Sequence, residues 1–507
     1  MLAWTQSTWV AQEVERLNPG VQIELVGIET RGDRILDFPL SQIEGKEFFV
    51  AEIDQALQEG RVDFTVHSMK DLSLKRPDDL VCAAIPKREN PRDVIVFGSG
   101  LMDRLGQGAT LRIGTSSPRR LENIPDFLTR ALPRIEKERK PPAFEFIEIR
   151  GNVNTRLSRV QSQSDKPLDG VVLALAGLIR LWKSPAGRSE LRKLFQGVRW
   201  MVLPLEYCPS APAQGALAVE CRAYDRDVLQ KLTLLHDPET EKAVSQERSL
   251  LEEWGGGCHQ RLGATIVTSS EFDCLFYIRG VRPNGELLHE VRWKVPQKIS
   301  CLDIRPWDGT QLHPQFSALN PELPVLEGKA VFVAHSRAVQ SVEPCSLLQS
   351  RVWTSGTQSW FKLAQQGIWV EGCSEGLGFE EMSRRLLKEA VLGLPPLTDW
   401  IVFTHKGAQG RWREMGKEGK NPSQVISTYQ VHYDLRAEEL VKFRQANSIF
   451  WSSGSQYQSL KEQVAQGVQH SCGPGKTASL LRQAGLLPMI FPSVMEWRKW
   501  LQIQHSI

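Results

Sequence analysis

The segment Gly255-Gly256-Gly257-Cys258-His259 follows a run of helical character, ETEKAVSQERSLLEEW at residues 239–254. Apolar residues recur among the charges of that run, and the three glycines predict that the helix ends there. Because glycine lacks a Cβ, we expect Cys258 on an adaptable loop, where the adjacent His259 would favour the nucleophilic thiolate. The alternative is a capped helix followed by a thiol of no special function. The rest of the chain decides between these two interpretations.

The composition is that of an ordinary globular protein divided into several domains. The chain has 507 residues, too many for one core, of which 41% are hydrophobic and 24% charged. Its net charge of +3 gives no general argument for nucleic-acid binding. The nine cysteines occur without a CxxC pair, which is typical of a reducing compartment and argues against a zinc site. No apolar run reaches the ~20 residues of a membrane span, so we expect a cytoplasmic protein with no metal, membrane or nucleic-acid partner.

The N-terminal part alternates between helical and strand-like patterns. Residues 5–17 are amphipathic, residues 21–28 (VQIELVGI) alternate as a strand does, and residues 62–66 (VDFTV) indicate a short buried strand. This order predicts a parallel α/β sheet, whose ligands collect at the carboxyl ends of its strands. The segment HSMKD at residues 67–71 lies at such an end.

Within this segment, Lys70 and Asp71 place a cation beside a carboxylate. One interpretation is a solvated turn followed by a helix cap, which is the commoner arrangement for such a pair. The other is a carboxylate in a cleft, which could stabilise a developing cation on a nitrogen heterocycle and pass a proton to an amine leaving group.

A second α/β block, roughly residues 110–205, has arginines after each of three predicted strands. The strand at 111–114 precedes TSSPRR at 115–120, where hydroxyls and a helix start form a general anion site. The strands at 144–149 and 170–175 precede RGNVNTR and AGLIR. Arginines on equivalent strand ends predict a polyanionic ligand, because guanidinium groups bind carboxylates through paired hydrogen bonds. These arginines are Arg119, Arg120, Arg150, Arg156 and Arg180.

Further units are expected towards the C-terminus. Strand-like runs between residues 263 and 295 follow the glycine-rich segment and predict a small α+β unit. A connector rich in Pro, Gln and Asn, residues 304–328, is interpreted as a linker. Beyond it, WIVFT at 400–404 resembles IFWSS at 449–453, and two helix patterns that close at glycine are also alike. These echoes indicate two related α/β subdomains.

Taken together, these motifs resemble the porphobilinogen deaminase (hydroxymethylbilane synthase) family over residues 2–298. The resemblance depends on their order and spacing, since any one alone would be a weak signal. It implies three α/β domains, of which the first two have a periplasmic-binding-protein-like fold and form the active-site cleft between them. The motifs are TRGD at 30–33, HSMKD at 67–71, GTSSPRR at 114–120, RGNVNTR at 150–156, AGLIR at 176–180, QGA at 214–216 and GGC at 256–258.

The resemblance also implies the cofactor and the reaction. A dipyrromethane cofactor, itself made from two porphobilinogens, is joined to Cys258 through a thioether. Four porphobilinogens are added head to tail with loss of ammonia, and hydrolysis releases the linear tetrapyrrole hydroxymethylbilane. Asp71 matches the catalytic aspartate, which assists the loss of ammonia and stabilises cationic intermediates, with Lys70 beside it. The implied cofactor contacts are Arg119, Arg120, Ser117 and Asp71, and the implied substrate contacts are Lys70, Arg150, Arg156, Arg180, Gln6 and Ser68.

The start of the chain departs from this family. The family opens with a strand carrying an arginine and a serine, and this sequence begins after them, at the segment matched by residues 2–6. We interpret this as a start codon assigned too late, and an intact mass of the native protein that matches Met1 as the true start would contradict it. The expected domains are residues 1–105 together with about 213–228, then 106–212 and 229–303, the linker 304–328, and a last region at 329–507.

The last region, residues 329–507, resembles uroporphyrinogen-III synthase. The resemblance rests on WIVFT, IFWSS and the GP-x2-T-x3-L-x3-G motif that starts at Gly473. That family uses two α/β domains, and the opening part of its first domain is missing or degenerate here. A fusion is expected because the linear tetrapyrrole closes spontaneously to the wrong isomer. Whether this region still closes the ring stays open at this point, and an assay of residues 320–507 for the type III isomer is one way to decide it.

A non-enzymatic interpretation is an anion-binding protein of periplasmic-binding-protein-like fold. The lack of a signal peptide and of a helix-turn-helix argues against a transport or regulatory binder, and a reversible binder has no use for Cys258. For the enzyme we expect porphobilinogen and linear tetrapyrrole intermediates as ligands, and a monomeric state.

Overall fold

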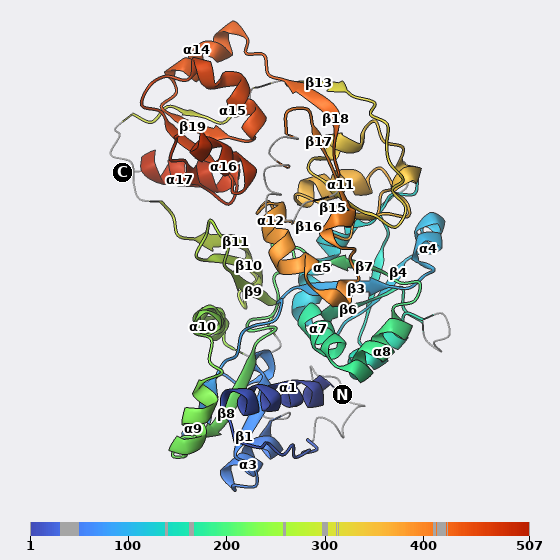
Figure 1. Cartoon of the computed structure of the whole chain (residues 1–507), viewed down its shortest axis with the longest axis vertical. Helices are drawn as coiled ribbons and strands as arrows, with labels where there is room; N and C mark the ends of the chain where they lie inside the picture. Colours follow the sequence, from blue (N-terminus) through green and yellow to red (C-terminus); the bar gives the residue numbers. More distant parts are fainter. Residues whose placement is uncertain are drawn as a thin grey trace.

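The computed structural model describes residues 2–30, 50–136, 140–161, 167–256, 260–296 and 303–505, the last range with gaps at 311, 313, 409–411, 413–421 and 423. These residues form mixed α/β units, with the blue N-terminal elements at one end of the long axis and the red C-terminal ones at the other (Figure 1). No helix among them is long and apolar enough to cross a membrane.

The first unit contains an antiparallel sheet in the order β1-β8-β2. Strand β8 returns from far along the chain to lie between β1 and β2, so the parallel pairing predicted for this part is wrong. Periodicity shows which side chains are buried, but it does not identify the partner strand. Val10 and Val14 of α1 pack against this sheet and close its core. The elements are α1 (Leu2–Leu17), α3 (Ala51–Gln58), β1 (Phe64–Ser68), η2 (Met69–Asp71), β2 (Leu80–Ala84), β8 (Leu217–Arg222) and α9 (Arg226–Thr233).

The strand predicted at residues 21–28 is not formed within the described chain. Val21 and Ile23 pack partly against the core beside α1, while Gln22 and Glu24 are exposed, which accounts for the alternation. The backbone N–H of Ile23 donates to Glu15 Oε1 at 2.8 Å instead of joining a ladder. The prediction was wrong because alternation follows side-chain burial, which an extended segment can satisfy without backbone pairing.

The second unit is a five-stranded sheet in the order β5-β4-β6-β3-β7. The predicted parallel strands are confirmed for β4, β5 and β6, whereas β3 runs antiparallel to β6 and β7. The pairing therefore groups β3 with the strands of residues 106–212, although the predicted first domain extended to 105. Helices α7 and α8 lie on the side that faces α1 (Figure 1). The elements are β3 (Asp93–Phe97), α4 (Leu101–Gln107), β4 (Leu111–Gly114), α5 (Pro118–Ala131), β5 (Phe144–Ile147), α6 (Val153–Ser158), β6 (Gly170–Ala174), α7 (Leu175–Lys183), α8 (Pro185–Leu194) and β7 (Arg199–Val202).

Two chain segments connect the first and second units. We call residues 85–92, between β2 and β3, the first crossover, and residues 203–216, between β7 and β8, the second crossover. They touch where the N–H of Glu89 donates to the carbonyl of Gly215 at 3.1 Å. Gly215 has φ +89°, and a Cβ there would lie 2.6 Å from the Glu89 carbonyl oxygen, so this contact requires glycine.

The third unit pairs α10 (Pro238–Glu253) with an antiparallel sheet of β9 (Leu262–Val267), β10 (Leu275–Val281) and β11 (Leu287–Trp293). The buried Glu247 of α10 accepts hydrogen bonds from the Ile266 N–H at 2.6 Å and from the Ala213 N–H at 2.7 Å, which ties the helix to its sheet and to the second crossover. Gly255 and Gly256 follow the helix with φ of +89° and +67°, which confirms the predicted helix end.

The C-terminal region, from β12 onward, forms two further sheets. One has the order β13-β18-β17-β14-β15-β16 and the other β12-β19-β20-β21, and all their pairs are parallel except β13 with β18. The segment predicted as a linker, 304–328, contributes one strand to each sheet, because its few apolar residues, among them Trp307, Leu312 and Leu326, are buried in the cores of this region. The strands are β12 (Pro306–Trp307), β13 (Gln315–Ala318), β14 (Ala330–Val333), β15 (Arg351–Thr354), β16 (Gly372–Cys373), β17 (Trp400–His405), β18 (Gln424–His432), β19 (Ser448–Trp451), β20 (Gln469–Cys472) and β21 (Met489–Ile490), and the helices include α11 (Thr357–Ala364), α12 (Phe379–Met382), α14 (Ala437–Gln445), α15 (Gly454–Leu460), α16 (Lys476–Gln483) and α17 (Val494–His505).

The C-terminal region shares a hydrophobic core with the second unit. The rings of Phe127 and Trp360 meet edge to face at 5.1 Å, and the Trp360 indole N–H donates to the Ala131 carbonyl at 3.2 Å. The N–H of Val202 in β7 donates to the Glu371 carbonyl at 2.8 Å. The region is therefore packed onto the second unit and is not a tethered appendage.

Candidate functional site

The carboxyl end of β1 turns directly into η2, which carries Lys70 and Asp71. The turn is fixed from beneath, because Arg248 donates to the carbonyls of Met69 at 2.9 Å and Leu72 at 3.1 Å. Asp71 is exposed, while Lys70 and Ser68 are half-buried. Burial lowers the pKa of the Lys70 amine, and the adjacent Asp71 carboxylate opposes that shift.

Arg119 and Arg120, at the start of α5, converge on the buried Asp93 at the start of β3. Arg119 Nη2 lies 2.7 Å from Asp93 Oδ2, and Arg120 Nη2 lies 2.7 Å from Asp93 Oδ1. Gln214 Nε2 donates to the same carboxylate at 2.9 Å. In addition, Arg119 Nη1 donates to the Pro209 carbonyl at 2.8 Å, and Arg120 Nη1 donates to the Val172 carbonyl at 3.0 Å. The predicted anion-binding arginines thus already share one internal carboxylate.

These groups form one electrostatic cluster with the end of β1. The charges of Asp71, Arg120, Asp93 and Arg119 all affect the pKa of the Lys70 amine. The pKa of Arg156 is lowered by burial and by Arg120, whereas Asp71 raises it. The cluster has four cations and two carboxylates, so an excess of positive charge remains. The cations are Lys70, Arg119, Arg120 and Arg156, and the carboxylates are Asp71 and Asp93. An anionic ligand would be attracted to the cluster for that reason.

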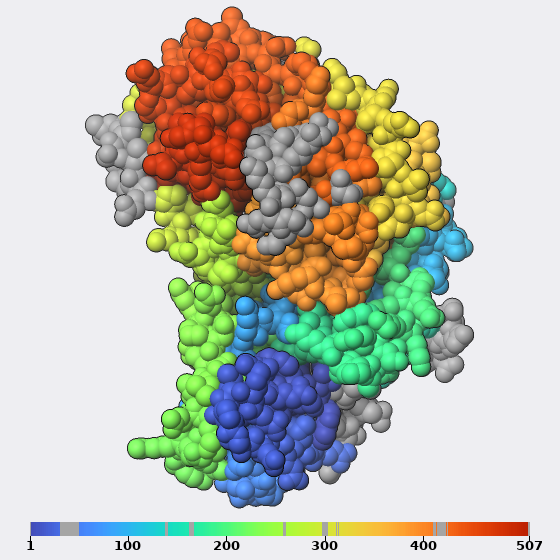
Figure 2. Space-filling model, in the orientation of Figure 1, coloured from blue at the N-terminus to red at the C-terminus, as the bar shows by residue number. Residues whose placement is uncertain are grey.

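Arg180 and Gln6 lie at a separate pocket where α1, the first crossover and α7 meet. The Arg180 guanidinium donates to the Gly215 carbonyl at 2.5 Å. Its burial lowers the pKa of Arg180 to about 10, against the favourable charge of Glu89. Lys183 pairs with Glu89 at the same place. In Figure 2 the dark-blue surface of the N-terminal helix lies directly below the green surface of α7 and α8.

The remaining predicted contacts lie at the ends of β4 and β5. Ser117 is the residue before α5, but its side chain makes no capping hydrogen bond. Its neighbour Ser116, which was not predicted, donates to the Ile149 carbonyl at 2.5 Å and accepts from the Ile149 N–H at 3.1 Å, so it joins the two strand ends. Arg150 follows, half-buried, and Arg156 Nε donates to the Gly151 carbonyl at 2.7 Å.

Cys258, together with Gly257 and His259, lies outside the described residues, as do Arg31, Gly32 and Asp33 of the TRGD motif. The described flanks of the cysteine segment are close to α5. Gln260 Nε2 donates to the Gly256 carbonyl at 3.4 Å, and Arg261 Nη1 lies 3.4 Å from Glu122 Oε2 on that helix.

Asp93 is the residue of this site that the sequence did not single out. The signal was present, since a carboxylate opens the apolar strand DVIVF. A charge at the start of such a strand must be paired if it is buried. Burial would raise the pKa of Asp93, but Arg119 and Arg120 outweigh it and hold that pKa far below its usual range.

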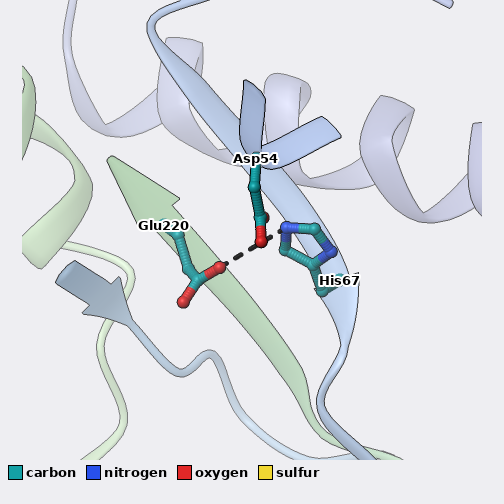
Figure 3. A group of neighbouring side chains, drawn as sticks. All are labelled: Asp54, His67 and Glu220. Atoms are coloured by element: carbon teal, nitrogen blue, oxygen red, sulfur yellow. Dashed lines mark ion pairs between the residues drawn. The ribbon is translucent and has the colours of Figure 1, made fainter. Parts of the chain in front are cut away.

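A second buried cluster lies behind the end of β1. Asp54 from α3, His67 from β1 and Glu220 from β8 point toward one another, with their ligand atoms within 4.8 Å (Figure 3). Arg76 Nη2 lies 2.6 Å from Asp54 Oδ1 and 2.7 Å from Glu220 Oε2. Since one guanidinium bonds both carboxylates, we interpret the cluster as an ion-pair network that supports the strand behind Lys70 and Asp71.

Fold and site together define a mixed α/β protein with a cluster of excess positive charge near the junction of two units. A family model described as porphobilinogen deaminase, dipyromethane cofactor binding domain, matches residues 1–230. Curated relatives called porphobilinogen deaminase include one from Syntrophotalea carbinolica, 39% identical over 290 residues (57% of this chain, 82% of the relative), and one from Brevibacillus brevis, 40% identical over 264 residues (52% and 76%). The chain belongs to the porphobilinogen deaminase family.

Similar solved structures include a uroporphyrinogen-III synthetase from Helicobacter pylori, 14% identical with a TM-score of 0.25, covering 37% of this chain and 89% of that one. Another is an amino acid ABC transporter substrate-binding protein from Streptococcus pneumoniae, 11% identical with a TM-score of 0.21, covering 49% and 82%. Both TM-scores are too low to assign either fold. The mixed α/β class is confirmed, and the periplasmic-binding-protein-like arrangement stays a prediction.

Proposed function

We propose that the chain is a porphobilinogen deaminase that joins porphobilinogen units head to tail and releases the linear tetrapyrrole by hydrolysis. The observation that carries the proposal is the cluster that Lys70, Arg119, Arg120 and Arg156 form with Asp71 and Asp93 in a member of this family. Each substrate unit bears an acetate and a propionate. Charge-assisted hydrogen bonds of about 1.5–3 kcal/mol each would hold such a chain in register.

The described residues fit a dipyrromethane cofactor. The cations of the cluster outnumber its carboxylates, and the buried Nε of Arg119 has no hydrogen-bond partner among the described residues. Arg119, Arg120 and Ser117 would hold the acidic side chains of the cofactor, and Cys258 would carry the thioether. When bound, the cofactor supplies the pyrrole carbon to which the first substrate unit is joined.

Asp71 is suited to the chemical step by its exposure beside Lys70 at a strand end. In each addition the bond between the aminomethyl carbon and its amino nitrogen breaks, and ammonia leaves. That carbon then bonds to a free pyrrole α-carbon, which loses its proton. The Asp71 carboxylate would stabilise the positive charge that develops on the substrate and accept the released proton. Arg150, Arg156, Arg180, Gln6, Lys70 and Ser68 would position the substrate carboxylates.

The purified recombinant chain is expected to exceed its sequence mass by one dipyrromethane unit, and Cys258→Ser should abolish the adduct because the serine hydroxyl is not a thiolate nucleophile. Intact-protein mass spectrometry measures both. Cys345→Ser is the control, since Cys345 is an exposed thiol outside the proposed attachment segment and should leave the adduct unchanged. An adduct that persists in Cys258→Ser would refute the attachment site, and a chain without any adduct would favour the anion-binding alternative.

The C-terminal region supports a second proposed function, closure of the linear tetrapyrrole to uroporphyrinogen III. Its two sheets agree with the two related α/β subdomains that the sequence predicts. The repeated helix pattern is present in α11 and α16, which are followed by Gly367 with φ +80° and Gly485 with φ +78°.

The full chain is expected to convert porphobilinogen mainly to the type III isomer, whereas a deaminase without synthase activity gives the type I isomer by spontaneous closure. Chromatography of the oxidised porphyrins separates the two. The full chain is the right sample, because residues 329–507 share a core with the second unit. Cys258→Ser supplied with the linear tetrapyrrole tests ring closure alone, and a type I product there would refute synthase activity.

A further inference from the structure

Glu375, in the C-terminal region, contacts both crossovers that connect the first and second units. Its Oε2 accepts a hydrogen bond from Arg92 Nη2 in the first crossover, and its Oε1 accepts one from the Leu205 N–H in the second. The side chains of Glu375 and Arg92 are only 3% and 4% exposed. One buried carboxylate therefore joins two chain segments that are far apart in sequence and that belong to another part of the fold.

The backbone of Glu375 is held in an unfavourable conformation. It has φ +53°, which residues with a Cβ rarely adopt, and it follows β16 in a turn that also contains Gly376 and Gly378 with φ of +76° and +98°. Conformations of this kind persist where the surrounding structure demands them. Here the demand is the placement of the carboxylate between Arg92 and Leu205.

Neighbouring groups of the C-terminal region reach the same crossovers. Asn90 Nδ2 donates to the Arg385 carbonyl at 3.0 Å, and Thr357 Oγ1 donates to Glu206 Oε2 at 3.1 Å. Asn90 lies two residues before Arg92, and Glu206 directly follows Leu205. The C-terminal region thus bonds each crossover more than once.

The first crossover leads directly into the cationic cluster. Arg92 precedes Asp93, the carboxylate that fixes Arg119 and Arg120. The second crossover is tied to the same residue, because the Leu203 N–H donates to the Asp93 carbonyl at 2.9 Å. It also contains Gln214, which donates to the Asp93 side chain. A change in the angle between the units would therefore move Asp93 and its arginines relative to Asp71.

We propose that Glu375 is a positioning residue for the deaminase reaction, which makes the C-terminal region a brace on the junction of the first two units. The inference rests on the proposed deaminase function. Through Arg92 and the Leu205 N–H, Glu375 holds the arginines of the second unit at the distance from Asp71 that the growing polyanion requires. It contacts neither substrate nor cofactor.

The test compares Glu375→Gln with Glu271→Gln in the full chain. Both changes remove a charge from an ion pair between the C-terminal region and the preceding units. Glu271, however, lies on the third unit and pairs with Arg482 of α16 at 2.6 Å, and none of its described hydrogen bonds or ion pairs involves a crossover residue. The measured quantities are kcat and KM for porphobilinogen and the hydrogen exchange of the amides of residues 87–90, 92–93, 203 and 205–208. Intact mass gives the number of rings bound per chain during turnover.

Glu375→Gln should lower kcat by about 10-fold or more, because small misplacements of catalytic groups have effects of this size. It should change KM less than twofold, let bound species of intermediate ring number accumulate, and raise exchange in both crossovers. Glu271→Gln should leave all of these within about twofold of the unchanged chain. Equal effects of the two substitutions, or crossover exchange unaffected by Glu375→Gln, would overturn the proposal. If the chain without any substitution has no deaminase activity, the proposed function is refuted instead. The exchange data would still decide whether Glu375 braces the crossovers.

Discussion

Asp71→Asn is expected to abolish turnover of porphobilinogen while the protein stays folded. Asparagine keeps the size of the side chain but removes the negative charge beside Lys70 and Arg156. The positive charge that develops as ammonia leaves would then lack its counter-charge, and no carboxylate would accept the released proton. Removing one stabilising group of this kind costs about 2.7–4 kcal/mol, or a factor of about 10² to 10³ in kcat. Ammonia release under saturating substrate measures it.

The control for this prediction is Asp63→Asn in the same unit. Asp63 is an exposed carboxylate that pairs with Arg222 at 3.3 Å, away from the cluster around Asp71. It should leave kcat within about twofold, because exposed ion pairs contribute at most about 1 kcal/mol. Circular dichroism should show both variants folded. Normal turnover by Asp71→Asn would show that another group carries the charge and the proton.

The elements that the sequence predicted well are those set by their own residues. The strands at 111–114 and 170–175 and the helix at 239–254 form as predicted, since continuous apolar runs and glycine ends are local signals. Strand partners were harder to predict because they depend on distant residues. Strand β8 inserts between β1 and β2 from more than a hundred residues away, and residues 21–28 have the alternation of a strand without a partner.

The residues of the site also divide into those that local motifs predicted and those that depend on distant parts of the chain. Motif order placed Lys70, Asp71 and Arg156 at strand ends, and the structure brings their charges within range of one another. The pairing of Arg119 and Arg120 with Asp93 could not be predicted from the sequence, because it depends on how distant elements pack together. Glu375 was missed for a similar reason, since its partners lie in a different part of the chain.

Asp93→Asn is expected to destabilise the second unit by about 3–5 kcal/mol, because it leaves two buried guanidinium groups without their carboxylate. Local unfolding free energies come from native-state hydrogen exchange of the amides of β3 and β6, the strands that Asp93 and its arginines join. Asp126→Asn is the matched control. It removes a carboxylate that pairs with Arg279 at 2.8 Å but is 52% exposed, so its effect should stay below about 1 kcal/mol.

The pH dependence of the stability lost in Asp93→Asn tests whether the charge of Asp93 is the cause of that loss. The arginines hold the pKa of Asp93 far below its usual range despite its burial. A lowered folded-state pKa contributes stability that is complete above the unfolded-state pKa of about 3.9 and is lost as the pH falls toward the folded-state value. The free-energy difference between the unchanged chain and Asp93→Asn should therefore be constant from about pH 7 to pH 5 and shrink below about pH 4. A difference that stays constant to pH 3 would show that Asp93 stabilises the unit through packing and not through its charge.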